Sequence, residues 1–333
     1  MEKTWAEWVR ENLDRNCDPN GIVDILLENK FGLTAIREYM GDSFPAGHFA
    51  AWQKKVQVSP VPGSPGYLSP KQAALFHVRR ELSRLAPRKH IERRSNVSRA
   101  EFLEEYYAAN TPVILSGLMD GWKACTRWGP EYFKTVRGDE TVEIQAGRDK
   151  NPAYEEDDSQ LRKTVKFSDY IDMVTTGGET NDYYLTARNN FFSRPGTKAL
   201  LNDIEVFREY LKTDNPGDGT FLWYGPKGTI TPLHHDLMNI FMAQVQGRKR
   251  VILIPSSESD LVYNDFAVYS PVDPVNPDYA RHPKFRAATV YDVELAPGEV
   301  LFLPVGWWHH VTSLDVSMTV SFNNFVFLNE FKW

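Results

Sequence analysis

The sequence predicts a mainly β protein with helices, in which an antiparallel β-sandwich or barrel follows a helical region over residues 1 to about 90. The second half of the chain contains many short segments rich in β-branched and aromatic residues, separated by Gly, Pro and Asn turns. The first part instead spaces its apolar residues by three and four, as amphipathic helices do. A proline- and glycine-dense segment, 59–66, is predicted as a connector within the helical region.

Four helices are predicted before residue 90, over 4–15, 22–29, 33–40 and from Ser69 onward. The last carries an apolar stripe at helical spacing, formed by Leu75, Val78, Leu82 and Leu85. We interpret residues 1–90 as a packing or dimerisation region, and a homodimer is one expected partner state.

The pattern of predicted elements changes near residue 95, where helices and strands begin to alternate. Helices are predicted over 100–109, 128–136 and 167–175, and strands over 112–117 and 141–146. Residues 150–164 are polar and acidic, which predicts an exposed loop. The later strands are predicted over 183–186, 220–224, 240–245, 250–254, 300–302 and 318–327.

Composition narrows the classes of function. The chain has 333 residues, 42% of them hydrophobic and 25% charged, with a net charge of −6, so broad binding to nucleic acid or anionic membrane is not expected. Only two cysteines occur, Cys17 and Cys125, which argues against a disulfide framework. The N-terminus lacks a signal-peptide core, and we therefore expect a cytoplasmic protein.

The candidate metal ligands are His234 and Asp236, joined by a histidine from the segment ending Trp307-Trp308-His309-His310. Alternate side chains of a strand share a face, so His234 and Asp236 point the same way and His235 points away. The same rule does not choose between His309 and His310. Two imidazoles and one carboxylate suit Fe(II), with positions left open for other ligands.

Lys249 begins a strongly apolar strand, where an ammonium group could meet a dicarboxylate cosubstrate. Because Arg248 and Arg250 flank it, composition alone favours a surface lysine.

Three ordered segments resemble the JmjC, or cupin-like, 2-oxoglutarate oxygenases, and most closely the protein-hydroxylase branch typified by the factor-inhibiting-HIF asparaginyl hydroxylase. These are Thr231-Pro-Leu-His-His-Asp236, then Ala243-Gln-Val-Gln-Gly-Arg-Lys-Arg250, and then Pro297-Gly-Glu-Val-Leu-Phe-Leu-Pro-Val-Gly-Trp-Trp-His-His310. The resemblance covers about 95 to 327 and assigns 91–333 to one oxygenase domain. It implies a double-stranded β-helix core of the jelly-roll or cupin type.

The resemblance also implies a set of cofactors and site residues. Fe(II) would be held by His234, Asp236 and His309, with 2-oxoglutarate as cosubstrate and O₂ as oxidant. The far carboxylate of the cosubstrate would meet Lys249, Thr231 and Tyr184, and Trp223 would form a wall of the pocket. Lys249 is thereby reinterpreted as a functional residue.

The chain departs from the family pattern at three places. Ile240 stands where relatives often have Asn, although Asn239 lies beside it. After Ser321-Phe322, where relatives tend to have Trp, this chain has Asn323 and Asn324. Gln145 stands where arginine-hydroxylating relatives have an acidic residue. His235, Asn239 and Ser321 are candidates for supporting the ligands, although packing roles are expected for them.

The expected reaction is hydroxylation of an unactivated C–H bond on a protein or peptide side chain, with succinate and CO₂ as coproducts. The alternatives are a hydroxylase of a small molecule or a modified tRNA base, and a non-catalytic cupin-type metal-binding protein. The sequence leaves open the substrate, the oligomeric state, and the choice between hydroxylation and demethylation.

Overall fold

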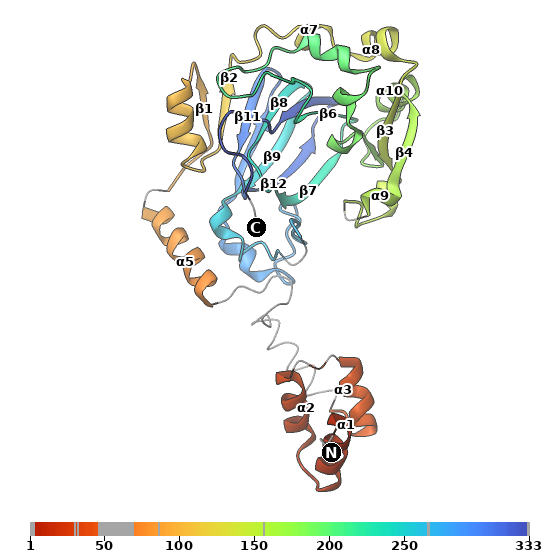
Figure 1. Ribbon diagram of the computed structural model, residues 1–333, viewed down its shortest axis with the longest axis vertical. Coiled ribbons are helices and arrows are strands. Elements are labelled where there is room, and N and C mark those ends of the chain that lie inside the picture. Colours follow the sequence, from red (N-terminus) through yellow and green to blue (C-terminus); the bar gives the residue numbers. More distant parts are fainter. Residues whose placement is uncertain are drawn as a thin grey trace. The chain divides into compact units, whose positions relative to one another are not determined.

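The computed structural model describes residues 4–29, 31, 33–45, 70–85, 87–155, 157–264 and 267–331 (Figure 1). The chain forms two compact units, residues 1–69 and 70–333. The predicted domain boundary near residue 90 therefore lies within the second unit. The predicted connector at 59–66 and the helix start at Ser69 lie outside the described residues.

The helices of the described chain are α1 (Trp5–Asp14), α2 (Pro19–Glu28), α3 (Leu33–Met40), α5 (Pro70–Leu85), α6 (Arg99–Glu101), α7 (Ala124–Arg127), α8 (Pro130–Arg137), α9 (Asp158–Leu161) and α10 (Phe167–Thr176). A π-helical turn, η2 (Phe102–Tyr107), follows α6. The 3-10 turns are η1 (Gly41–Ser43), η3 (Arg148–Lys150), η4 (Ala187–Asn189), η5 (Phe191–Ser193), η6 (Lys198–Asp203), η7 (Ser256–Glu258) and η8 (Pro283–Ala287).

The strands are β1 (Glu92–Ser95), β2 (Val113–Ser116), β3 (Thr141–Ala146), β4 (Arg162–Lys166), β5 (Tyr183–Tyr184), β6 (Thr220–Gly225), β7 (Ile230–His235), β8 (Ile240–Gln246), β9 (Lys249–Ile254), β10 (Tyr291–Leu295), β11 (Glu299–Leu303), β12 (Trp308–Ser313) and β13 (Ser317–Phe322). Within the described residues they form a six-stranded sheet in the order β1-β2-β11-β8-β13-β6, a four-stranded sheet in the order β10-β9-β12-β7, and a small sheet in the order β4-β3-β5.

The first unit is a small bundle of α1, α2 and α3. Thr4 caps α1 in a capping box with Glu7, which satisfies backbone N–H groups at the helix start. Val9, Val23, Leu26 and Ile36 are buried in its core.

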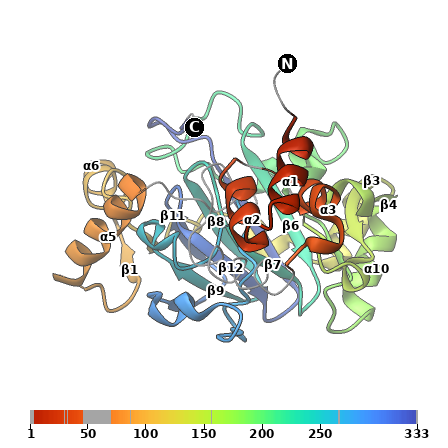
Figure 2. The same cartoon turned by 90° about the horizontal axis from the view of Figure 1, so that it is seen from below.

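In the second unit the two larger sheets face each other, and strand alternation builds two cores. Leu301 and Leu303 of β11 pack with Val251 and Leu253 of β9 between the sheets. The intervening side chains of β11, Val300 and Phe302, enter the larger core on the other face of the six-stranded sheet. Figures 1 and 2 show the small sheet and α10 on one side of the two large sheets, and α5 on the other side, near the edge strand β1 of the six-stranded sheet. The fold is mainly β with helices and fits the jelly-roll expectation.

Helix α5 belongs to the second unit and packs against the 3-10 turn η7 of the same unit. Arg80 Nη1 lies 2.8 Å from Asp260 Oδ1 beside this contact. The predicted apolar stripe lies on the other side, where Leu75, Val78, Leu82 and Leu85 are each more than half exposed.

Two predictions about the elements are wrong. Residues 150–164 are not a simple exposed loop, because they contain α9 and the start of β4 and bury the side chain of Asp158. Asp158 accepts hydrogen bonds from Gln145 and Arg162, which hold the segment against β3. The predicted strand 318–327 ends at Phe322, where Asn323 and Asn324 leave the ladder.

No helix among the described residues has both the length and the apolar character needed for a membrane span.

Candidate active site

Three side chains that could hold a metal ion meet between the two large sheets. The ligand atoms of His234, Asp236 and His309 all lie within 4.8 Å of one another. His309 Nε2 is 3.6 Å from Asp236 Oδ2, and the rings of His234 and His309 are 4.1 Å apart between centroids. This is the same trio that the family resemblance implied.

Strand register explains why His309, and not His310, faces this point. His309 pairs directly with His234 across β12 and β7. His310 points to the opposite face of the four-stranded sheet, where burial lowers its pKa to about 4. The register between the strands shifts after His309, so that Pro232 and Leu233 of β7 form a bulge. The bulge brings Thr231 and His234 to the same cavity, although simple alternation would separate them.

Backbone contacts fix the two ligand-bearing segments against each other. Gly306 has φ +78°, a conformation that favours glycine, and its N–H donates to the Asp236 carbonyl at 3.0 Å. The Nδ1 atoms of His234 and His309 lie 2.8 Å from the Pro232 carbonyl and 3.1 Å from the Trp307 carbonyl. If each Nδ1 carries the proton, each Nε2 is left with a lone pair for a metal.

The electrostatics of the trio also suit a cation. Burial lowers the pKa of His309 well below its usual range, and the neighbouring His234 adds to this effect, so the imidazole stays neutral. Desolvation raises the pKa of Asp236, whereas His234 and His235 oppose that rise. Two imidazoles and one desolvated carboxylate form a nitrogen- and oxygen-donor set that fits Fe(II).

A cavity of about 320 Å³ extends from the trio between the sheets. Thr231, Tyr184, Trp223 and Lys249, the predicted cosubstrate residues, all line it. Lys249 is buried, and its Nζ donates to Tyr184 Oη at 3.0 Å. Burial lowers the pKa of Lys249 to about 7. The composition-based interpretation of Lys249 as a surface residue is therefore wrong, since its strand turns the ammonium inward.

The other candidate residues contribute walls and packing. Trp223 Nε1 donates to Ser321 Oγ at 2.9 Å, and both side chains line the cavity. His235 packs edge-on against Trp308, away from the trio. Asn239 is buried and binds the side chain of Asn329, so its position is structural, and Ile240 lines the cavity instead.

Residues near the opening were not identified from the sequence. Glu155, Arg188 and Tyr269 line the cavity, and Tyr269 lies beside His234 through an isolated strand bridge. Glu155 belongs to the segment that was predicted as an exposed loop. The apolar residues Pro152, Ala153 and Tyr154 within that acidic stretch were the one signal that it packs.

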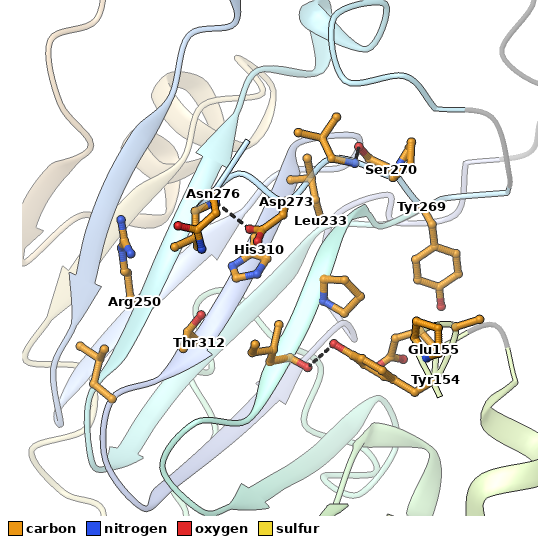
Figure 3. A pocket seen from close by; sticks show the side chains of 18 residues that line it. Tyr154, Glu155, Leu233, Arg250, Tyr269, Ser270, Asp273, Asn276, His310 and Thr312 are labelled. Carbon is orange, nitrogen blue, oxygen red and sulfur yellow. Dashed lines mark hydrogen bonds between the residues drawn. The ribbon is translucent and has the colours of Figure 1, made fainter. Parts of the chain in front are cut away.

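A second cavity, of about 500 Å³, lies on the outer face of the four-stranded sheet (Figure 3). His310 and Thr312 of β12 line it together with Asp273 and Asn276. Glu155 and Tyr269 line both cavities, so the outer cavity adjoins the opening of the inner one.

Comparison with known proteins identifies the family. The cupin-like domain model matches residues 99–326, and the chain belongs to this family of cupin-like JmjC domains. Lysine-specific demethylase 8 of Danio rerio is 32% identical over 250 residues, which cover 72% of this chain and 59% of the relative. Lysine-specific demethylase JMJ30 of Arabidopsis thaliana is 34% identical over 241 residues, which cover 70% of this chain and 54% of the relative. HSPB1-associated protein 1 of Homo sapiens is 29% identical over 240 residues, which cover 66% of this chain and 48% of the relative.

The chain thus spans about half the length of the curated relatives that it matches. The JmjC and cupin-like resemblance is confirmed. JmjC oxygenases use Fe(II), 2-oxoglutarate and O₂, in agreement with the expected cofactors. The factor-inhibiting-HIF branch stays a prediction, since the relatives named above carry other names.

Proposed function

We propose that this protein is an Fe(II)- and 2-oxoglutarate-dependent oxygenase that hydroxylates an unactivated C–H bond on a protein or peptide side chain. The observation that carries the proposal is the meeting of His234, Asp236 and His309 at one end of a cavity with Lys249 at its buried end. We assign the trio as the iron ligands, and Lys249, Thr231 and Tyr184 as the residues that bind the far carboxylate of 2-oxoglutarate.

Each residue has a defined task in this scheme. His234, Asp236 and His309 would hold the metal through one ligand atom each. Lys249 and Tyr184 orient the cosubstrate through the carboxylate remote from the metal, and Trp223 limits the access of water to the pocket. When bound, Fe(II) with 2-oxoglutarate and O₂ supplies the oxidising chemistry, with succinate and CO₂ as coproducts.

A polypeptide substrate is favoured over a small molecule or a tRNA base. The outer cavity offers room for residues that flank a target side chain inserted past Glu155 and Tyr269. Two relatives are named as lysine-specific demethylases, which makes removal of a methyl group from lysine the second candidate reaction. Hydroxylation adds about 16 Da to the product, whereas demethylation releases formaldehyde, so mass spectrometry of candidate peptides separates the two.

The proposal also covers the domain organisation, the oligomeric state and the location of the protein. We place the catalytic domain at 91–333 and retain a homodimer formed through the helices before residue 90, with the exposed stripe of α5 as support. A cytoplasmic location is proposed because Cys17 and Cys125 are both free thiols.

The decisive test of the function is release of CO₂ from 2-oxoglutarate by the Fe(II)-loaded protein. His234→Ala and Asp236→Ala should abolish it. His310→Asn, which changes the opposite face of the strand that carries His309, should retain binding of Fe(II) and 2-oxoglutarate. Unchanged turnover in the first two variants would refute the proposal. Absence of turnover in the wild type with any peptide, despite metal binding, would favour the non-catalytic alternative.

A further inference from the structure

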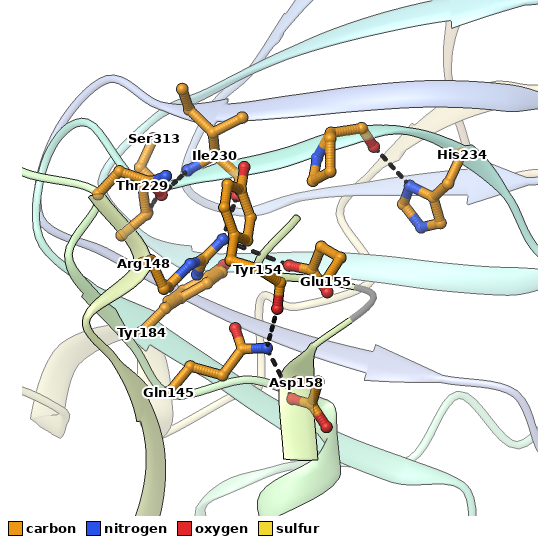
Figure 4. Close-up of polar contacts among 12 residues, drawn as sticks. Gln145, Arg148, Tyr154, Glu155, Asp158, Tyr184, Thr229, Ile230, His234 and Ser313 are labelled. Atoms are coloured by element: carbon orange, nitrogen blue, oxygen red, sulfur yellow. Dashed lines mark hydrogen bonds and ion pairs between the residues drawn. The ribbon is translucent and has the colours of Figure 1, made fainter. Parts of the chain in front are cut away.

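A second cation, Arg148, is buried beside the cosubstrate end of the inner cavity (Figure 4). It follows β3 and Gly147, whose φ of +92° turns the chain inward. Its side chain is completely buried. The guanidinium carbon lies 4.3 Å from the ring centroid of Tyr154 and 5.2 Å from that of Tyr184, so both rings flank it.

The polar contacts of Arg148 are few for a buried charge. Nη2 donates to the Ile230 carbonyl at 2.5 Å and to Glu155 Oε1 at 3.3 Å. Nε and Nη1 are buried with no hydrogen-bond acceptor among the described residues. An arginine cannot shed its charge, and a buried pair of this kind is often no more stable than an apolar replacement. Stability therefore gives little reason for an arginine at this position.

Arg148 contacts one of the residues that we assign to the cosubstrate and the residue directly before another. It lies against the ring of Tyr184, and it binds the carbonyl of Ile230, the residue directly before Thr231. These residues stand on β5 and β7, which belong to different sheets. One rigid guanidinium thus fixes both strands at the closed end of the cavity.

The hydroxyl of Tyr184 shows what this restraint would achieve. Its oxygen accepts from Lys249 Nζ, so its own hydrogen remains available to donate to a carboxylate. The charge of Arg148 lowers the pKa of this hydroxyl, against the larger rise caused by burial, and so makes it a stronger donor. A ring that swung about its Cα–Cβ bond, or shifted with its strand, would carry the hydroxyl away from Lys249.

We propose that Arg148 is a positioning residue of the cosubstrate site: its guanidinium, held between Tyr154 and Tyr184, keeps the Tyr184 hydroxyl aligned with Lys249 to receive the carboxylate of 2-oxoglutarate. Arg148 is not among the residues that line the cavity, so it would act through Tyr184 and not by direct contact with the cosubstrate. This inference rests on the proposed function of the same cavity.

The test is a double-mutant cycle on the full chain loaded with Mn(II). Calorimetry measures the affinity for 2-oxoglutarate in the wild type, Arg148→Met, Tyr184→Phe and the double variant. Each single substitution should weaken binding by about tenfold, the loss typical of one hydrogen bond to a charged group. Because Arg148 acts through the hydroxyl, its loss should cost little in the Tyr184→Phe background.

Two controls separate positioning from general damage. Arg250→Met removes an arginine of β9, whose guanidinium binds Asp292 at the surface, and should leave the affinity for 2-oxoglutarate unchanged. If Arg148→Met does not fold, as judged by thermal melting, Arg148→Lys takes its place in the cycle. Lysine keeps the charge but loses the planar fork, so a smaller loss that again disappears with Tyr184→Phe is expected.

Wild-type affinity in the Arg148 variant would overturn the inference, and so would independent losses that multiply to about a hundredfold in the double variant. Failure of the proposed function has a different signature. In that case neither the wild type nor Tyr184→Phe would show metal-dependent binding of 2-oxoglutarate.

Discussion

Lys249 gives the prediction with the clearest pH signature. Burial lowers its pKa from 10.5 to about 7, so the amine of the empty pocket is largely neutral at pH 8. A dicarboxylate binds the charged form, and an anion placed beside the amine raises its pKa again. Binding of 2-oxoglutarate should therefore take up a proton.

The magnitude follows from the lowered pKa. About half of the amine is charged at pH 7 and about one-tenth at pH 8, so affinity should fall by roughly fivefold over that step and close to tenfold over the next. Proton uptake at pH 8 should approach about 0.9 per bound 2-oxoglutarate. The lowered pKa of Lys249 also makes the stability of the protein without cosubstrate depend on pH. Between pH 7 and about 10.5 the lysine is protonated in the unfolded chain but largely neutral in the folded protein. The free energy of unfolding should therefore rise with pH over this range.

Calorimetry of the Mn(II)-loaded protein in buffers of different ionisation enthalpy measures both affinity and proton uptake. Lys249→Met should lose most of the affinity and all of the uptake. Lys249→Arg keeps its charge at every pH in this range and should flatten the profile. An affinity that is constant from pH 7 to 9, with no proton taken up by the wild type, would refute the assignment of Lys249.

Three further predictions follow from the fold. Phe102→Ala should destabilise the protein by about 3–5 kcal/mol in urea unfolding, because the ring is fully buried and contacts Tyr210 and Phe302; a loss below about 1 kcal/mol would contradict this packing. Deletion of residues 1–90, which removes the exposed stripe of α5, should yield monomers in sedimentation, and a fragment that still dimerises would rule out a dimer through this region. Mn(II) should raise the melting temperature of the wild type but not of Asp236→Ala, since a ligand that binds only the folded state stabilises it; an equal rise in both would count against the trio.

The candidate site was predictable from sequence where local rules determine direction. Alternation along a strand correctly placed His234 and Asp236 on one side and His235 on the other. It did not choose between His309 and His310, because that choice depends on the register of β12 against β7. The resemblance supplied the answer that local geometry lacked.

The sequence was least informative where a contact joins distant segments. The bulge at Pro232 and Leu233 is set by pairing with β12, and no local pattern signals it. Lys249 was ambiguous because two arginines flank it, and only the sheet shows that its side chain points inward. Glu155 was missed because residues 150–164 were predicted to be an exposed loop. Arg148 lies just before that stretch and carried no signal in the sequence, because the rings of Tyr154 and Tyr184 that cover its guanidinium come together only in the fold.

The central claim is that His234, Asp236 and His309 bind Fe(II) beside 2-oxoglutarate, and anaerobic titration tests it most directly. Addition of Fe(II) to the protein with 2-oxoglutarate should produce a visible charge-transfer band that saturates at one iron per chain. The band should be absent in His234→Ala and Asp236→Ala and retained in His310→Asn. A band that persists in the first two variants, or that never forms in the wild type, would contradict the account.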